Sequence, residues 1–136
     1  MQILQPPGWA RPRGYSNGIA ARGTLVSIAG QIGWNAEAQF VSDNFVEQAR
    51  QALANIVEVL AQAGGRPEHI VRMTWYVVDK QEYLSGGKAL GDAYKALMRG
   101  ADGRTHYPVM TAVQVVALIE DRARVEIEAT AVIPEV

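Results

Sequence analysis

Alternating apolar and polar positions near the start of the chain predict two short strands. They cover residues 16–21 and 24–30. Arg22 and Gly23 stand between them, a pair typical of a two-residue hairpin turn, because glycine adopts positive φ without strain. A short extended piece is expected at residues 39–41. The pattern therefore predicts an antiparallel hairpin early in the fold.

Three longer strands are predicted further along the chain. Residues 69–78 are rich in β-branched and aromatic side chains. Residues 124–133 alternate with a period of two, so that apolar side chains share one face and two glutamates lie on the other. Residues 109–118 differ, because apolar side chains stand on both faces of this strand. Something other than solvent is expected to cover the second face.

Apolar residues at three- and four-residue steps predict two helices, one before and one after the strand at 69–78 in the sequence. Asn44 and Glu47 have the spacing of a capping box at the start of the first helix. Asp79 and Glu82 repeat this spacing at the start of the second. Glycines at 86 and 87 are expected to weaken the first turns of the second helix.

The order of elements predicts an α+β fold, with a mixed sheet of five or six strands and two helices on one face. Two helices cannot cover both faces of such a sheet. Leaving the apolar residues of the second face in water would forgo several kcal/mol, at roughly 25 cal/mol per Å². A homo-oligomer that buries this face is therefore expected.

The 136 residues match the size of one domain, covering 1–136. A net charge of −1 gives no electrostatic argument for nucleic acid or an anionic membrane as partner. With no cysteine, thiolate chemistry is excluded. His69 and His106 lack ligand partners at metal-binding spacing, so no metal is expected. The first residues do not resemble a signal peptide, and a cytoplasmic location is expected.

Four stretches together resemble the Rid family, also called YjgF or L-PSP. They are GYSNGIAARGTLVSIAGQIGW (14–34), EQARQALANIVEVLAQAGG (47–65), TWYVVDKQEY (74–83), and YPVMTAVQVVAL with VEIEATAV (107–118 and 125–132). The resemblance implies a chorismate-mutase-like fold assembled as a homotrimer with clefts between subunits. It further implies hydrolysis of reactive enamines or imines to carbonyl products and ammonia, without metal or cofactor. An endoribonuclease activity is also associated with the family.

The resemblance also implies which residues line the cleft. Glu126 matches the acid that orients or activates water, and Gly30, followed by Gln31, matches a glycine whose backbone lines the cleft. Tyr15 matches a tyrosine at its mouth, and Ala112 a position whose backbone contacts the ligand. Met110 stands where the deaminase branch has an arginine that binds the substrate carboxylate.

This methionine changes the expected chemistry, because a thioether cannot reproduce the bidentate contact of a guanidinium with a carboxylate. The small substrate 2-aminoacrylate is therefore not the expected one. Arg104 and His106, just before the strand, are candidates for a replacement cation, and Tyr107 for stacking on a planar ligand. Each also fits a simple solvated or structural role.

Glu126 likewise has a structural alternative, a strand glutamate paired with Arg72 or Arg124. Three functions follow from these residues. The first is an enamine or imine deaminase acting on a small molecule, and the second is a trimer that binds a metabolite without turnover. A ribonuclease is the least favoured, because the chain is near neutral and lacks paired histidines.

Overall fold

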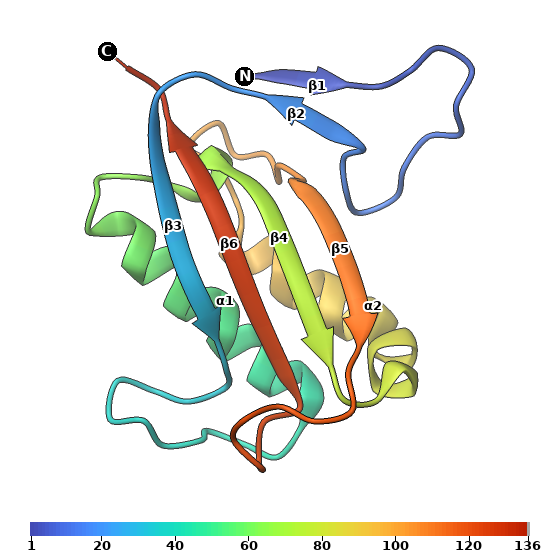
Figure 1. The fold of residues 1–136 in the computed structure, drawn as a ribbon, viewed down its shortest axis with the longest axis vertical. Coiled ribbons are helices and arrows are strands. Elements are labelled where there is room, and N and C mark those ends of the chain that lie inside the picture. The colour runs from blue at the N-terminus through green and yellow to red at the C-terminus, as the bar shows by residue number, and fades with distance from the viewer. Residues whose placement is uncertain (136) are drawn as a thin grey trace.

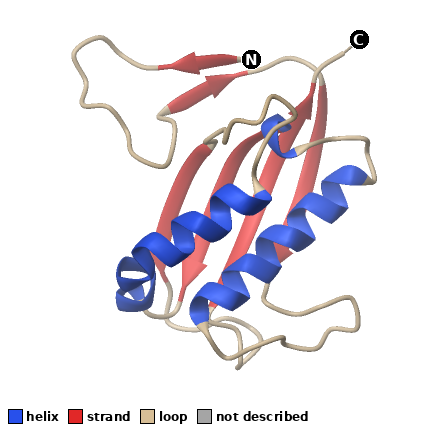
Figure 2. Ribbon diagram, turned by 180° about the vertical axis from the view of Figure 1, so that it is seen from behind, coloured by secondary structure: helices blue, strands red, loops and turns tan. Residues whose placement is uncertain are grey.

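The computed structural model describes residues 1–135 as a mixed β-sheet with two long helices on one face (Figures 1 and 2). The elements in chain order are β1 (Gln2–Leu4), β2 (Gly18–Ala20), β3 (Thr24–Gln31), α1 (Phe45–Ala61), a short 3₁₀ helix η1 (Pro67–His69), β4 (Ile70–Val77), α2 (Lys80–Leu97), β5 (Val109–Gln114) and β6 (Val125–Ile133). None of the helices in this range is both long and apolar enough to cross a membrane.

The main sheet has the strand order β3-β6-β4-β5. β6 is antiparallel to both of its neighbours, whereas β4 and β5 are parallel. Helix α2 connects these two parallel strands and returns the chain across one face of the sheet. Helix α1 covers the same face, and the other face has no helix against it (Figure 2). The α+β prediction is confirmed, but the main sheet has four strands rather than the predicted five or six, because β1 and β2 form a separate pair.

The predicted hairpin at residues 16–30 was wrong. β2 pairs with β1, with Gln2 opposite Ala20, and this pair lies above the end of the main sheet (Figure 1). Gly23 has a φ of +146°, and a Cβ there would collide with the carbonyl oxygen of Ile133. Glycine at this position therefore allows the start of β3 to approach the end of β6 closely. The Arg22–Gly23 pair resembled a hairpin turn, and for this reason the prediction failed.

The face of the sheet that meets the helices forms the core. On β6, Val125, Ile127 and Ala131 are fully buried, as the alternation predicted. Leu53 and Ile56 of α1 are also fully buried and belong to the same cluster. The two glutamates of β6 lie on the opposite, open face.

Helix α1 begins as predicted at Asn44, whose side chain accepts a hydrogen bond from the Glu47 N–H at 3.1 Å. In a full capping box the Asn44 N–H would donate to the Glu47 side chain. Here it donates instead to the Ser42 hydroxyl at 2.9 Å. The chain leaves the helix through Gly64, which has a φ of +79°.

Helix α2 begins at Asp79, whose carboxylate accepts from the Gln81 N–H at 2.9 Å. Its capping-box partner Glu82 is used elsewhere, since it binds Arg124 at 2.8 Å. Gly87 interrupts the helix with φ 29° and ψ −107°, which confirms the predicted weakness of the first turns.

Strand β5 is shorter than the predicted 109–118, because it ends at Gln114. The next N–H, of Val115, donates to the Val77 carbonyl at 2.8 Å and closes the ladder. The chain then leaves the sheet, and Val116 and Ile119 in the following loop are fully exposed.

Candidate active site

The predicted site residues lie on opposite faces of the sheet. Tyr76 of β4 stands opposite Glu126 of β6, and both alternate with buried neighbours, so they lie on the open face. Met73 of β4 is fully buried on the helix side, and its partner Met110 on β5 packs against the same core. One copy of the chain therefore cannot bring Glu126 and Met110 to the same ligand.

The first half of the site is a hollow of about 300 Å³ on the open face. It is lined by Gly30, Tyr76, Val115, Ala117, Leu118, Ile119, Glu126 and Glu128. A Cβ added to Gly30 would collide with the Glu126 carboxylate. Glycine at this position therefore lets the carboxylate lie directly against the backbone of β3. The side chain of Gln31, the next residue, donates to the Ala29 carbonyl at 3.1 Å.

Hydrogen bonds fix the neighbours of Glu126. The Tyr76 hydroxyl donates to the Glu128 carboxylate at 2.8 Å, and this bond, followed by burial, raises the pKa of Tyr76. The structural alternative for Glu126, a pairing with Arg72 or Arg124, was wrong, because Arg124 binds Glu82 and Arg72 stands opposite Thr130. Among residues 1–135, no ion pair involves Glu126.

The second half is a cavity of about 310 Å³ between α2, β4 and the start of β5. We name it the α2 cavity; it is lined by Gly14, Trp75, Tyr83, Leu84, Gly87, Leu90, Gly91, Tyr94, Tyr107 and Met110. The Tyr94 and Tyr107 rings stack 5.6 Å apart, with 7° between their planes. Trp75 and Tyr83 meet edge to face at 6.0 Å. The walls are therefore aromatic and apolar.

Two polar atoms in these walls lack hydrogen-bond partners. They are the indole Nε1 of Trp75 and the hydroxyl of Tyr94, and both are buried. Burial, with a smaller effect from Tyr107, raises the pKa of Tyr94, and burial also raises the pKa of Tyr83. Both tyrosines are therefore neutral at physiological pH and keep their hydroxyl protons.

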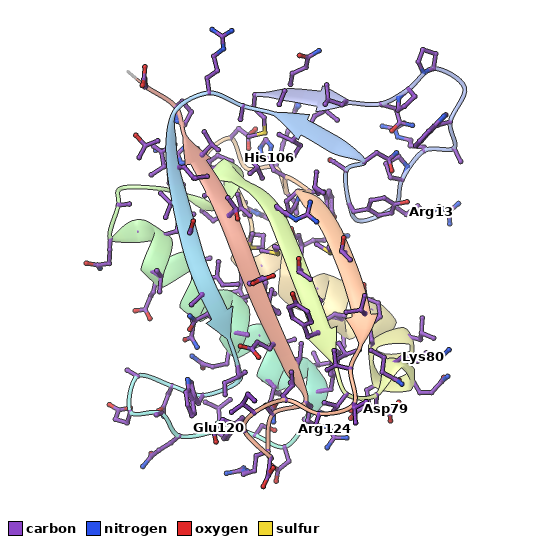
Figure 3. The ribbon with its side chains drawn as sticks, viewed as in Figure 1. Arg13, Asp79, Lys80, His106, Glu120 and Arg124 are labelled. Atoms are coloured by element: carbon purple, nitrogen blue, oxygen red, sulfur yellow. The ribbon has the colours of Figure 1, made fainter. Side chains whose placement is uncertain are left out.

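Tyr15, Arg104 and His106 line a third feature, a groove of about 900 Å³ beneath the β1–β2 pair. His106 lies 2.9 Å from the Asp102 carboxylate, whose pKa is lowered first by the Arg104 N–H and then by His106. Figure 3 shows His106 near the β1–β2 pair and Glu120 at the other end of the sheet. Arg104 and His106 therefore do not line the α2 cavity with Met110.

Tyr107 connects the groove and the α2 cavity, since it lines both. Its carbonyl accepts from the Ser16 hydroxyl at 2.6 Å, and the Ser16 N–H donates to the Pro108 carbonyl at 3.0 Å. These bonds hold the chain around Gly14 against the start of β5. Ala112 lies further along β5, opposite Trp75, and is exposed.

Tyr83 was not predicted as a site residue, and Trp75, which lines the same cavity, is 2% exposed and also belongs to the core. A pattern that could have found the cavity is the spacing of residues 83, 87, 90, 91 and 94, which share one face of a helix. The two glycines on this face leave open space, because a Cβ at either would meet nothing within 4 Å. Across residues 1–135, no group of three or more metal-ligating side chains occurs.

The fold is that of an α+β protein whose predicted site residues lie on opposite faces of one sheet. The family model described as Endoribonuclease L-PSP matches residues 9–133. The chain belongs to this family, the Rid (YjgF/L-PSP) family.

Similar proteins agree with this assignment. The goat (Capra hircus) 2-iminobutanoate/2-iminopropanoate deaminase is 36% identical over 119 residues, covering 87% of this chain and 79% of its own. The human (Homo sapiens) protein of the same name is 32% identical over 133 residues, covering 97% and 88%. The crystal structure of YyfB, a Rid protein of unknown function from Yersinia pestis, has a TM-score of 0.84 at 30% identity, covering 97% and 98%.

Proposed function

We propose that the protein hydrolyses an imine or enamine to a carbonyl compound and ammonia, in a cleft between copies of a homotrimer. The contact of Gly30 with the Glu126 carboxylate carries this proposal, since it lets an acid lie against the backbone of β3 beside an open hollow. The names of the goat and human relatives describe imine deaminases. No cofactor is needed for this reaction.

Two copies are required because the sheet separates the halves of the site. The open face carries Glu126, whereas Met110 and Tyr107 belong to the helix side of β5. Exposed apolar residues at Val116 and Ile119 lie next to the Glu126 hollow, where a second copy would cover them. A ring of three copies repeats one heterologous contact and closes without free edges.

In this arrangement Glu126 acts as a general base and then as a general acid. Its carboxylate takes a proton from water as the oxygen attacks the carbon of the C=N bond. The C=N electron pair moves to nitrogen, which takes that proton from Glu126, and a tetrahedral carbinolamine forms. Glu126 then takes the proton of the carbinolamine hydroxyl and passes it to the amino nitrogen, so that ammonia leaves as the C=O bond forms and the carboxylate recovers its starting state. The balance is one water consumed and one ammonia released.

The test is ammonia release from imines that an amino acid oxidase or an amine oxidase generates in place. We expect Glu126→Gln to lower kcat by about 10²-fold or more while the oligomer persists, because an amide cannot accept the proton. Glu58→Gln, at an exposed position on α1, is the matched control and should remain active. Equal rates for wild type and Glu126→Gln would remove Glu126 from the mechanism.

A metabolite-binding trimer without turnover is the second candidate. The observation that favours it is Met110, since no charged side chain among the described lining residues replaces an anchoring arginine in the α2 cavity. Saturable binding of phenylacetone or phenylpyruvate, with no ammonia released from any imine that the oxidases generate, would support this candidate. RNA incubated with rigorously repurified protein tests the activity that the family description names.

A further inference from the structure

We propose that the substrate of this site carries no carboxylate, and that an apolar or aromatic body of the substrate occupies the α2 cavity. The substrate would be a neutral imine or enamine, or its protonated iminium form. This inference rests on the proposed function in one respect, namely that a neighbouring copy brings its Glu126 hollow to the α2 cavity.

The charges around both halves disfavour an anion. None of the side chains that line the α2 cavity in the described chain is charged. The hollow on the open face has Glu126 and Glu128 as its charged residues, and Glu120 lines the adjoining hollow of about 170 Å³. The assembled site would therefore hold carboxylates without a lining cation. Like charges repel most strongly where water is excluded, so a substrate carboxylate would be rejected and an iminium favoured.

Arg72, Arg104 and Arg124 are three cations around the two half-sites, and each lines another feature or pairs elsewhere. Arg104 lines the groove beneath the β1–β2 pair, on the far side of Tyr107 from the cavity. Arg124 is held by Glu82 at 2.8 Å. Arg72 lies on the open face opposite Thr130 and lines a separate hollow with Ser27. None of these three lines the α2 cavity or the Glu126 hollow.

The walls of the α2 cavity suit a flat apolar group. Tyr94 and Tyr107 present stacked rings, and Met110 supplies a polarisable thioether that packs well against aromatic groups. Gly87 and Gly91 leave open space on α2 where other residues would place side chains. The α2 cavity therefore has open space beside the helix and is lined by apolar side chains.

The unpartnered Trp75 Nε1 and Tyr94 hydroxyl add a second, independent observation. Buried donors without partners are rare and costly in folded proteins. Both side chains line the same cavity. A ligand with a neutral acceptor, such as an ether or carbonyl oxygen, or a water that enters with it, would satisfy them without introducing charge.

The experiment compares two stable ketones that differ in one group. Phenylacetone is neutral, and phenylpyruvate is the same ketone with a carboxylate. Binding to the intact oligomer is measured by calorimetry and by tryptophan fluorescence. We expect phenylacetone to bind about tenfold or more tightly than phenylpyruvate, because unpaired buried charges are strongly rejected.

Variants then locate the binding. Gly91→Leu fills the open space of the cavity and should weaken phenylacetone binding about tenfold or more. Ala96→Leu, an exposed position on the same helix, is the matched control and should bind like wild type. Met110→Arg should reverse the preference toward phenylpyruvate. Circular dichroism and oligomer size confirm that each variant folds.

The outcomes separate this inference from the proposed function. Tighter binding of phenylpyruvate by wild type, or unchanged binding in Gly91→Leu, would overturn the inference. Ammonia release only from carboxylate-bearing imines would overturn it and leave the deaminase function standing. Selective phenylacetone binding without any turnover would support the inference and refute the deaminase function.

Discussion

The reason for glycine at position 30 is the neighbouring Glu126 side chain and not the backbone conformation of Gly30 itself. Its φ lies outside the positive region, unlike those of Gly23 and Gly64. The Glu126 carboxylate occupies the space that a Cβ would need, so a larger residue would displace this carboxylate. The glycine thus fixes how close the acid lies to β3, and with it the place where a water or substrate can meet the carboxylate.

We therefore predict that Gly30→Ala impairs catalysis more than folding. The added methyl group would push the Glu126 carboxylate away, and a shift of about 1 Å in a catalytic group costs about 10²-fold in rate. Steady-state ammonia release measures the effect. Gly86→Ala is the control, because the nearest atom to its Cβ would lie at an ordinary 3.5 Å. Full activity in Gly30→Ala would show that the contact with Glu126 has no catalytic role.

For single residues, the sequence predicted which residues belong to the candidate site better than it predicted which of them lie close together. The resemblance marked Gly30 and Glu126, and the structure brings them into contact. It also grouped Glu126 with Met110, which one sheet keeps on opposite faces. Position along a strand or helix gives the face of a residue, but only the three-dimensional packing tells which residues share a hollow, and Tyr83 was missed as a cavity wall for this reason.

Among the elements, the start of α1 is tied to the loop before β6 by one buried amide. Gln48 is completely buried, and its Nε2 donates to the carbonyls of Ser42 and Arg122 at 2.9 and 3.0 Å. Its Oε1 accepts from the Arg124 N–H at 2.8 Å. This amide thus satisfies three backbone groups and fixes where β6 begins, immediately before Glu126.

We predict that Gln48→Leu lowers the free energy of unfolding by about 2–5 kcal/mol, because buried backbone groups would lose their partners. Urea unfolding followed by circular dichroism measures the change. Gln62→Leu, at the exposed end of the same helix, should stay within about 0.5 kcal/mol of wild type. A Gln48→Leu protein as stable as wild type would mean that water replaces the amide.

The elements with strong periodicity were predicted well, and the ones set by distant partners were not. The helices and the strands β4 and β6 follow from repeated apolar positions. The pairing of β2 did not, because its partner β1 has only three residues and lies in a proline-rich segment. A strand of that length is defined by its partner rather than by a pattern of its own.

At the scale of the whole molecule, one sheet separates the two halves of the proposed site. The apolar residues Val116 and Ile119 stand fully exposed beside the half that carries Glu126. Exposed apolar side chains next to a functional hollow are typical of an interface between subunits. Assembly and catalysis are therefore expected to depend on the same surface.

The first consequence is that Ile119→Asp, or the double change with Val116→Asp, should convert the oligomer to monomers, since a buried unpaired charge is costly at an interface. Light scattering coupled to size exclusion measures the mass. Val59→Asp places the same charge on an exposed part of α1 and should leave the assembly intact. A stable oligomer in the Ile119→Asp protein would move the interface elsewhere.

The second consequence tests whether each site uses two subunits. Glu126→Gln disables the first half, and Gly91→Trp fills the second half, so either protein alone should be inactive. When the two variants are refolded together in equal amounts, random mixing in a closed ring gives about one site in four with both halves intact. Ammonia release should therefore recover to about a quarter of the wild-type rate. A site built within one chain would instead stay inactive in every mixture, because each chain carries one of the two defects.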